Sequence, residues 1–138
     1  KDQYGYPGSK PPWGNLTSID LTNGKINWTI PFGEYEKLTK KNIPITGTVN
    51  FGGVAATAGN LVFATGTVDN KVRAYRATDG EELWSYKMKY LGSSPPTIFE
   101  YNNDQYLLIV STGSYTIKAQ FPDQTEFGDI IYAFKLKK

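Results

Sequence analysis

The chain has 138 residues, of which 39% are hydrophobic, 20% charged and 14% aromatic. This composition is typical of one globular unit with its own core, and it excludes a disordered chain. The 15 basic and 13 acidic side chains leave a formal net charge of +2. No run of five like charges occurs, so we expect no nucleic-acid partner.

Missing residue types narrow the chemistry further. The chain contains no His and no Cys, which excludes a His-based catalytic triad, a thiolate nucleophile and a zinc site built from Cys and His. It begins without Met or a hydrophobic leader, and no apolar run is long enough to span a bilayer. We therefore expect a mature or excised piece of a longer protein.

The 14 Gly and 8 Pro residues separate short segments rich in β-branched and aromatic residues, a pattern that predicts strands joined by turns. In chain order, the predicted strands are residues 16–21, 25–30, 54–58, 61–66, 71–77, 82–88, 96–101, 105–111 and 129–135. No segment of helical length shows an apolar stripe. Residues 33–41 could form one helical turn, but Pro44 and the Thr-Gly-Thr sequence that follows favour a loop.

One pattern occurs twice, so that Trp28 recurs as Trp84, 56 residues later. In each copy a strand leads into Thr-Asn-Gly (22–24) or Thr-Asp-Gly (78–80), and the Trp lies four residues after the Gly. Asn, Asp and Gly tolerate the positive φ angles of tight hairpin turns. A third copy begins at residues 129–134. The repeat predicts antiparallel hairpins whose Trp side chains are structural wedges, packed flat between neighbouring units.

A unit of about 40 to 50 residues with four strands and a fixed aromatic signature is typical of a propeller blade. The predicted strands fall into three blade parts, at residues 14–30, 53–89 and 95–138. The predicted fold is therefore all-β, a partial β-propeller of about two and a quarter four-stranded blades. Since propellers close with about four to eight blades, this chain needs further blades to close.

Three runs of the sequence carry a family resemblance: Pro-Pro-Trp-Gly at 11–14, the run 47–63 that contains Asn-Phe-Gly-Gly, and Gly-Asp-Ile-Ile-Tyr-Ala-Phe at 128–134. Together they resemble the C-terminal part of the pyrroloquinoline-quinone (PQQ)-dependent dehydrogenases, and the membrane glucose dehydrogenase-like branch most of all. The resemblance implies an eight-bladed propeller of which this chain is roughly the last quarter.

In that family PQQ lies near the central axis with a calcium or magnesium ion beside it. The metal ligands and the carboxylate base lie on blades absent from this chain, so the resemblance assigns it no catalytic residue and no metal ligand. The implied partners are the remaining blades, a sugar or alcohol substrate, and a membrane quinone or cytochrome that accepts electrons. The implied location is the bacterial periplasm, with membrane association through the parent chain as an option.

Asn50, Gly52, Gly53 and Val54 are the candidate cofactor contacts, because they lead into the innermost strand of the complete blade. Glycines there would let the backbone approach a flat, anionic ring, so that N–H groups could bond its oxygens. The alternative interpretation is that the glycines only avoid crowding near the axis.

Asp69 and Ser114 are the candidate residues at the substrate mouth. The family often keeps an Asp or Asn pair where this chain has Asp69-Asn70, although such a turn also forms through bonds to its local backbone. Glucose-type relatives commonly carry Gly-Gly-His where this chain has Gly113-Ser114-Tyr115, which puts glucose in doubt as the substrate. The insert at residues 115–127 either reshapes the entrance or is an ordinary surface loop.

Two functions follow from these observations. The first is a fragment of a PQQ-dependent sugar or alcohol dehydrogenase that contributes part of the cofactor floor. The alternative is a non-catalytic periplasmic propeller scaffold of the outer-membrane-assembly type. The isolated fragment is expected to be inactive under either hypothesis.

Overall fold

The structure is a computed structural model that describes residues 1–121 and 126–136. Within these residues, nine strands form three antiparallel sheets. The first sheet pairs β1 (Asn15–Asp20) with β2 (Lys25–Pro31). The second contains β3 (Val54–Ala56), β4 (Leu61–Ala64), β5 (Lys71–Arg76) and β6 (Glu82–Lys87), in that order. The third contains β7 (Thr97–Tyr101), β8 (Asp104–Ser111) and β9 (Ile130–Lys135). Each predicted strand is confirmed.

The two hairpins of the repeat have the same local construction. Gly24 and Gly80 both have positive φ angles, +71° and +77°, which is why the turn between β1 and β2 and the turn between β5 and β6 need glycine. The strand register also shifts at matching positions, between Ser18 and Ile19 and between Ala74 and Tyr75. The sequence repeat is therefore a structural repeat.

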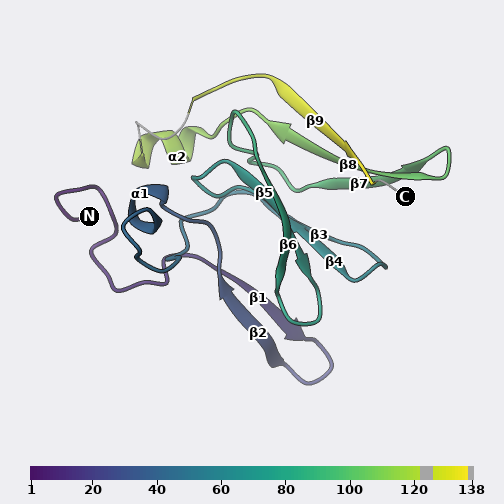
Figure 1. Cartoon of the computed structure of the whole chain (residues 1–138), viewed down its shortest axis with the longest axis horizontal. Coiled ribbons are helices and arrows are strands. Elements are labelled where there is room, and N and C mark those ends of the chain that lie inside the picture. The colour runs from purple at the N-terminus through teal and green to yellow at the C-terminus, as the bar shows by residue number, and fades with distance from the viewer. Residues whose placement is uncertain (122–125, 137–138) are drawn as a thin grey trace.

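The three sheets lie beside one another as successive blades, and within residues 1–121 and 126–136 no sheet closes into a barrel (Figure 1). The core lies between the sheets. Phe32, which follows β2, packs with Ala64 and Tyr75 of the second sheet. At the next interface, Val72 and Met88 pack with Leu107 and Ile109 of the third sheet. This arrangement, antiparallel sheets with apolar side chains packed face to face, is that of a partial propeller.

Trp28 is a wedge between the first two sheets, as predicted. Its indole Nε1 donates a 2.9 Å hydrogen bond to the carbonyl oxygen of Ala77, and a Cβ built on Gly80 would come within 2.8 Å of its ring. Trp84 faces the third sheet, where its ring meets that of Phe134 edge to face at 5.2 Å. Its contact is therefore not the flat packing that was expected, and its side chain remains 37% exposed.

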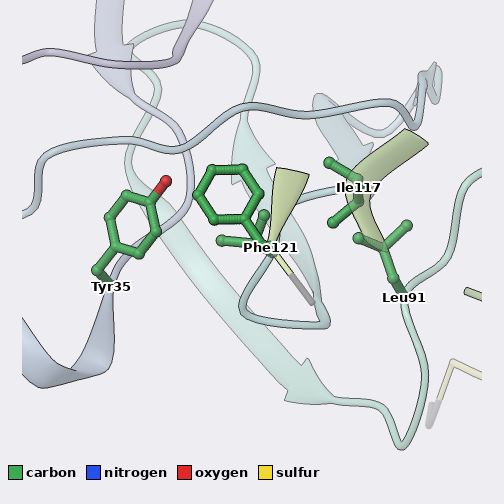
Figure 2. Close-up of a cluster of buried hydrophobic side chains, with 5 residues drawn as sticks. Tyr35, Leu91, Ile117 and Phe121 are labelled. Atoms are coloured by element: carbon green, nitrogen blue, oxygen red, sulfur yellow. The ribbon is translucent and has the colours of Figure 1, made fainter. Parts of the chain in front are cut away.

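Two short helices were not predicted. Residues 33–41 contain α1 (Glu36–Thr39) rather than a loop alone, and the insert contains α2 (Tyr115–Gln120). Figure 1 shows both helices gathered at one end of the sheets. Ile117 of α2 and the adjacent Phe121 are buried with Tyr35 and Leu91 in a cluster (Figure 2). The insert is thus not an ordinary surface loop. No helix among the described residues is long and apolar enough to cross a membrane.

Candidate functional site

The entry to strand β3 lies where the second and third sheets meet. A Cβ built on Gly53 would come within 2.8 Å of the ring of Pro95, two residues before β7 begins. The first strands of the two sheets therefore start side by side. Strands that begin each blade and converge in this way are expected to line the axis of a propeller.

Two glycines that face each other here, Gly52 before β3 and Gly66 after β4, are required by the protein's own packing. A Cβ on Gly52 would overlap the carbonyl oxygen of Thr65 at 2.1 Å, and a Cβ on Gly66 would overlap the Gly52 nitrogen at 1.9 Å. The segments 51–53 and 65–66 are joined by hydrogen bonds, from the Phe51 amide to the Gly66 carbonyl at 3.0 Å and from the Thr65 amide to the Gly53 carbonyl at 3.3 Å. This close approach agrees with the interpretation that the glycines avoid crowding.

The outer edge of β3 nevertheless presents groups suited to a flat, anionic ligand. The strand is at the end of its sheet, and Gly53 is bonded to Thr65 of the neighbouring segment. Because bonding alternates along an antiparallel strand, the N–H and C=O of Val54 point away from β4. The Val54 side chain is 55% exposed and Asn50 is exposed as well. This segment thus offers a backbone N–H, an exposed amide and an exposed apolar side chain, which are the types of group that hold a flat, anionic cofactor such as PQQ.

The loop between β4 and β5 contributes to a buried group of charged residues around Asp69. Its carboxylate forms an ion pair with Arg73, and the two side chains are only 1% and 5% exposed. Asp69 also accepts hydrogen bonds from the Thr67 hydroxyl at 2.6 Å, from the Lys71 amide at 3.1 Å and from the Glu34 amide at 2.9 Å. The structure therefore supports the alternative interpretation, a turn whose Asp bonds nearby backbone.

The electrostatics of this pair favour its charged form. Burial by itself would raise the pKa of Asp69, but the hydrogen bonds and positive charge of Arg73 outweigh it and hold that pKa below its usual value. Burial likewise opposes the charge of Arg73, whereas Asp69 raises the Arg73 pKa above its usual value. Glu82 adds an ion pair to the other side of the guanidinium, at 3.2 Å from Nε.

Asp69 borders a cavity of ≈ 300 Å³ between the N-terminal segment, the segment after β2 and the second sheet, which is also lined by Tyr6, Tyr35 and Asn70. Within the described residues, the Tyr35 hydroxyl and the Asn70 Oδ1 atom are buried without a hydrogen-bond partner. Burial raises the pKa of Tyr35 to about 12, with the nearby Tyr6 as a second cause. The Asp69 carboxylate is already bonded to groups of the protein itself. A place for Asp69 at the substrate mouth stays a prediction.

Ser114 lies at the start of α2, where its hydroxyl accepts a 3.4 Å hydrogen bond from the Ile117 amide. This contact makes Ser114 the N-cap of the helix. The structure does not bring Ser114 into the group around Asp69, and its role at the substrate mouth stays a prediction. Sequence reasoning missed Thr67 and Arg73, although both stand in the run Thr-Val-Asp-Asn-Lys-Val-Arg at 67–73.

Comparison with known proteins defines the class. Residues 1–107 match the family model described as "Glucose/ethanol/alcohol dehydrogenase, beta-propeller domain", the PQQ family. The chain therefore belongs to the PQQ-dependent dehydrogenase propeller family, as the sequence resemblance implied.

Individual relatives agree with this assignment. The quinoprotein glucose dehydrogenase of Escherichia coli is 30% identical over 142 residues, which covers 96% of this chain and 17% of that protein. The glycerol dehydrogenase large subunit of Gluconobacter oxydans is 32% identical over 139 residues, covering 96% of this chain and 18% of that protein. The chain thus spans less than a fifth of the length of these relatives.

Solved structures show the same fold. The quinohemoprotein alcohol dehydrogenase of Comamonas testosteroni aligns with a TM-score of 0.64 at 24% identity, covering 94% of this chain and 17% of that chain. A europium-containing methanol dehydrogenase aligns with a TM-score of 0.66 at 21% identity, covering 88% and 23%. These alignments support a partial β-propeller.

Proposed function

We propose that this chain is the C-terminal segment of a PQQ-dependent dehydrogenase that oxidises a sugar or an alcohol, and that it supplies part of the cofactor floor. The family membership and the names of the relatives support the class of reaction. The observation that carries the floor is the open edge of β3, where the Val54 backbone points away from β4 and the Val54 side chain is exposed, as Asn50 is in the segment before it.

The chain's own residues would bind and orient the cofactor. The bound quinone supplies the electron sink for oxidation. The Asn50 amide offers a hydrogen-bond donor, the Val54 backbone offers an unpaired N–H, and the Val54 side chain offers an apolar surface for a planar ring. Gly52 and Gly53 let the entry to β3 pack closely against Thr65 and Pro95, which fixes the position of this edge.

The metal and the catalytic base are proposed to lie on other blades. Among the residues that the structure describes, no group of three or more His, Cys, Asp or Glu side chains could hold a metal ion. The remaining partners are the other blades, the sugar or alcohol substrate, and a membrane quinone or cytochrome as electron acceptor. We place the parent protein in the bacterial periplasm.

The test is PQQ binding by the full-length parent protein, with Val54→Asp as the main variant. A carboxylate at this exposed edge would oppose an anionic cofactor, so we expect about tenfold weaker binding or more. Asn50→Ala should weaken binding by a smaller factor. Affinity is measured by titrating PQQ and following its absorbance, in the presence of calcium.

A matched control separates an effect at the open edge of β3 from a general effect of added negative charge. Leu83→Asp adds a carboxylate to β6 on the opposite edge of the same sheet, at a side chain that is 44% exposed, and should leave PQQ affinity unchanged. Equal affinities for wild type and Val54→Asp would refute the cofactor floor. A parent protein that binds no PQQ and oxidises no sugar or alcohol would favour the scaffold instead.

A further inference from the structure

We propose that Asp69, Thr67 and Arg73 form a positioning site that holds the segment 48–53 in the shape needed for the quinone floor. The inference rests on the proposed function, because it assigns a task to the groups behind the floor. None of the three side chains is proposed to touch the cofactor or the substrate.

The first step of the argument is that the site specifies a geometry. Asp69 and Arg73 are almost fully buried, and a buried ion pair costs desolvation energy that its attraction offsets only in part. Thr67 completes the site, since its hydroxyl donates to Asp69 Oδ1 at 2.6 Å and accepts from Arg73 Nη1 at 3.1 Å. Such a saturated group of charges favours one conformation of the loop between β4 and β5.

The second step connects this loop to the floor. Thr67 forms an antiparallel bridge with Asn50, and the neighbouring Gly66 carbonyl accepts from the Phe51 amide at 3.0 Å. On the other side, the Val68 amide donates to the Thr48 hydroxyl at 3.4 Å. Three consecutive residues of the loop therefore hold the segment that carries the candidate cofactor contacts.

The third step is that Asp69 also fixes the preceding blade. Its Oδ2 atom accepts the Glu34 amide at 2.9 Å, in the segment that follows β2. The same carboxylate thus bonds both the segment that leaves the first sheet and the loop that holds the entry to β3. Removing its charge would loosen the floor from two sides.

The experiment uses the full-length parent protein and compares Thr67→Val with Thr67→Ser, and Asp69→Asn with Asp79→Asn. Valine has the shape of threonine without the hydroxyl, whereas serine keeps it. Asp79 is a matched control in the exposed turn between β5 and β6. Like Asp69, it accepts hydrogen bonds from a backbone amide, that of Glu81 at 3.0 Å, and from an arginine, Arg76 at 2.9 Å. The readouts are PQQ affinity, the absorption spectrum of bound PQQ, and the melting temperature without PQQ.

We expect Thr67→Val and Asp69→Asn to weaken PQQ binding by about tenfold and to change the bound spectrum, as is usual for groups that orient a ligand contact. Thr67→Ser should rescue binding to within about twofold, and Asp79→Asn should bind as wild type does. If Thr67→Val and Asp69→Asn only lower the melting temperature while Val54→Asp weakens binding, the positioning role is wrong and the floor stands. If all of these variants bind PQQ normally, both proposals are wrong.

Discussion

The two interfaces between the sheets use the same Trp motif in different surroundings. At the first interface, Trp28 is hydrogen-bonded to Ala77 and covered by the turn at Gly80. At the second, Trp84 is partly exposed and lines a cavity of ≈ 620 Å³ with Phe63, Tyr106 and Phe134. The motif therefore places an indole between sheets, and the neighbouring sheet decides how far that indole is buried.

The polar contacts differ in the same way. At the first interface, Lys71 and Lys87 of the second sheet form ion pairs with Glu34 and Glu36, in the segment that follows β2. The second interface is held by apolar packing and by neutral hydrogen bonds such as Thr65 Oγ1 to the Gly92 carbonyl, at 3.2 Å. The first interface should thus respond to pH and the second should not.

The largest expected effect is the removal of each indole. Trp28→Ala should lower the free energy of unfolding by about 3–5 kcal/mol, because it removes a packed ring and its hydrogen bond. Trp84→Ala should cost less, since Trp84 is 37% exposed and rests on ring contacts with Tyr86 and Phe134 rather than under a turn. Urea unfolding of both variants checks the difference, and equal losses would contradict the contrast between the interfaces.

A smaller effect is expected at the hairpin glycines. Gly80→Ala should destabilise the protein by about 2–4 kcal/mol. The positive φ angle at residue 80 is strained for alanine, and the added methyl group overlaps the Trp28 ring. Gly24→Ala is the matched control, since Gly24 has a similar φ but nothing within 4 Å of the added Cβ, so it should cost about 1 kcal/mol. Thermal unfolding of the two variants measures the gap, which would vanish if Trp28 did not rest on this turn.

The smallest effect is a selective loosening of the first interface in acid. The folded-state pKa values of Asp69 and Glu36 are both lowered, that of Glu36 mainly by its hydrogen bond to Lys87. Groups with lowered pKa values stabilise the fold above their unfolded values of about 4, and this contribution is lost as the pH falls through the folded values. The basic groups that face them are Arg73 for Asp69 and Lys87 for Glu36.

Hydrogen exchange followed from pH 7 down to pH 3 tests this expectation, after correction for the intrinsic rate at each pH. Amides of β1 and β2 should lose protection at a higher pH than those of β7 and β8. Asp69→Asn removes one of the two carboxylates, so it should lower the protection of β1 and β2 already at neutral pH. Uniform loss of protection in all three sheets would show that the first interface is not the acid-sensitive one.

The strands and hairpins could be predicted because their signals are local. Alternating β-branched residues and the Asn-Gly and Asp-Gly turns fix each hairpin within about a dozen residues. Helix α2 could not be predicted in this way, since its single buried residue, Ile117, is covered by Tyr35 and Leu91 from distant parts of the chain. The same holds for α1, a single turn with no buried residue of its own.

For the candidate site, the sequence by itself determined the family and the residues at the entry to β3, because both are written in contiguous runs such as Asn50 to Val54. Only the tertiary structure decided what those residues face. Gly52 is needed because the backbone of Thr65 and Gly66 lies against it, and Asp69 is occupied because Arg73, Thr67 and the Glu34 amide converge on it. Contacts between segments depend on how the blades pack, which no local pattern of residues encodes.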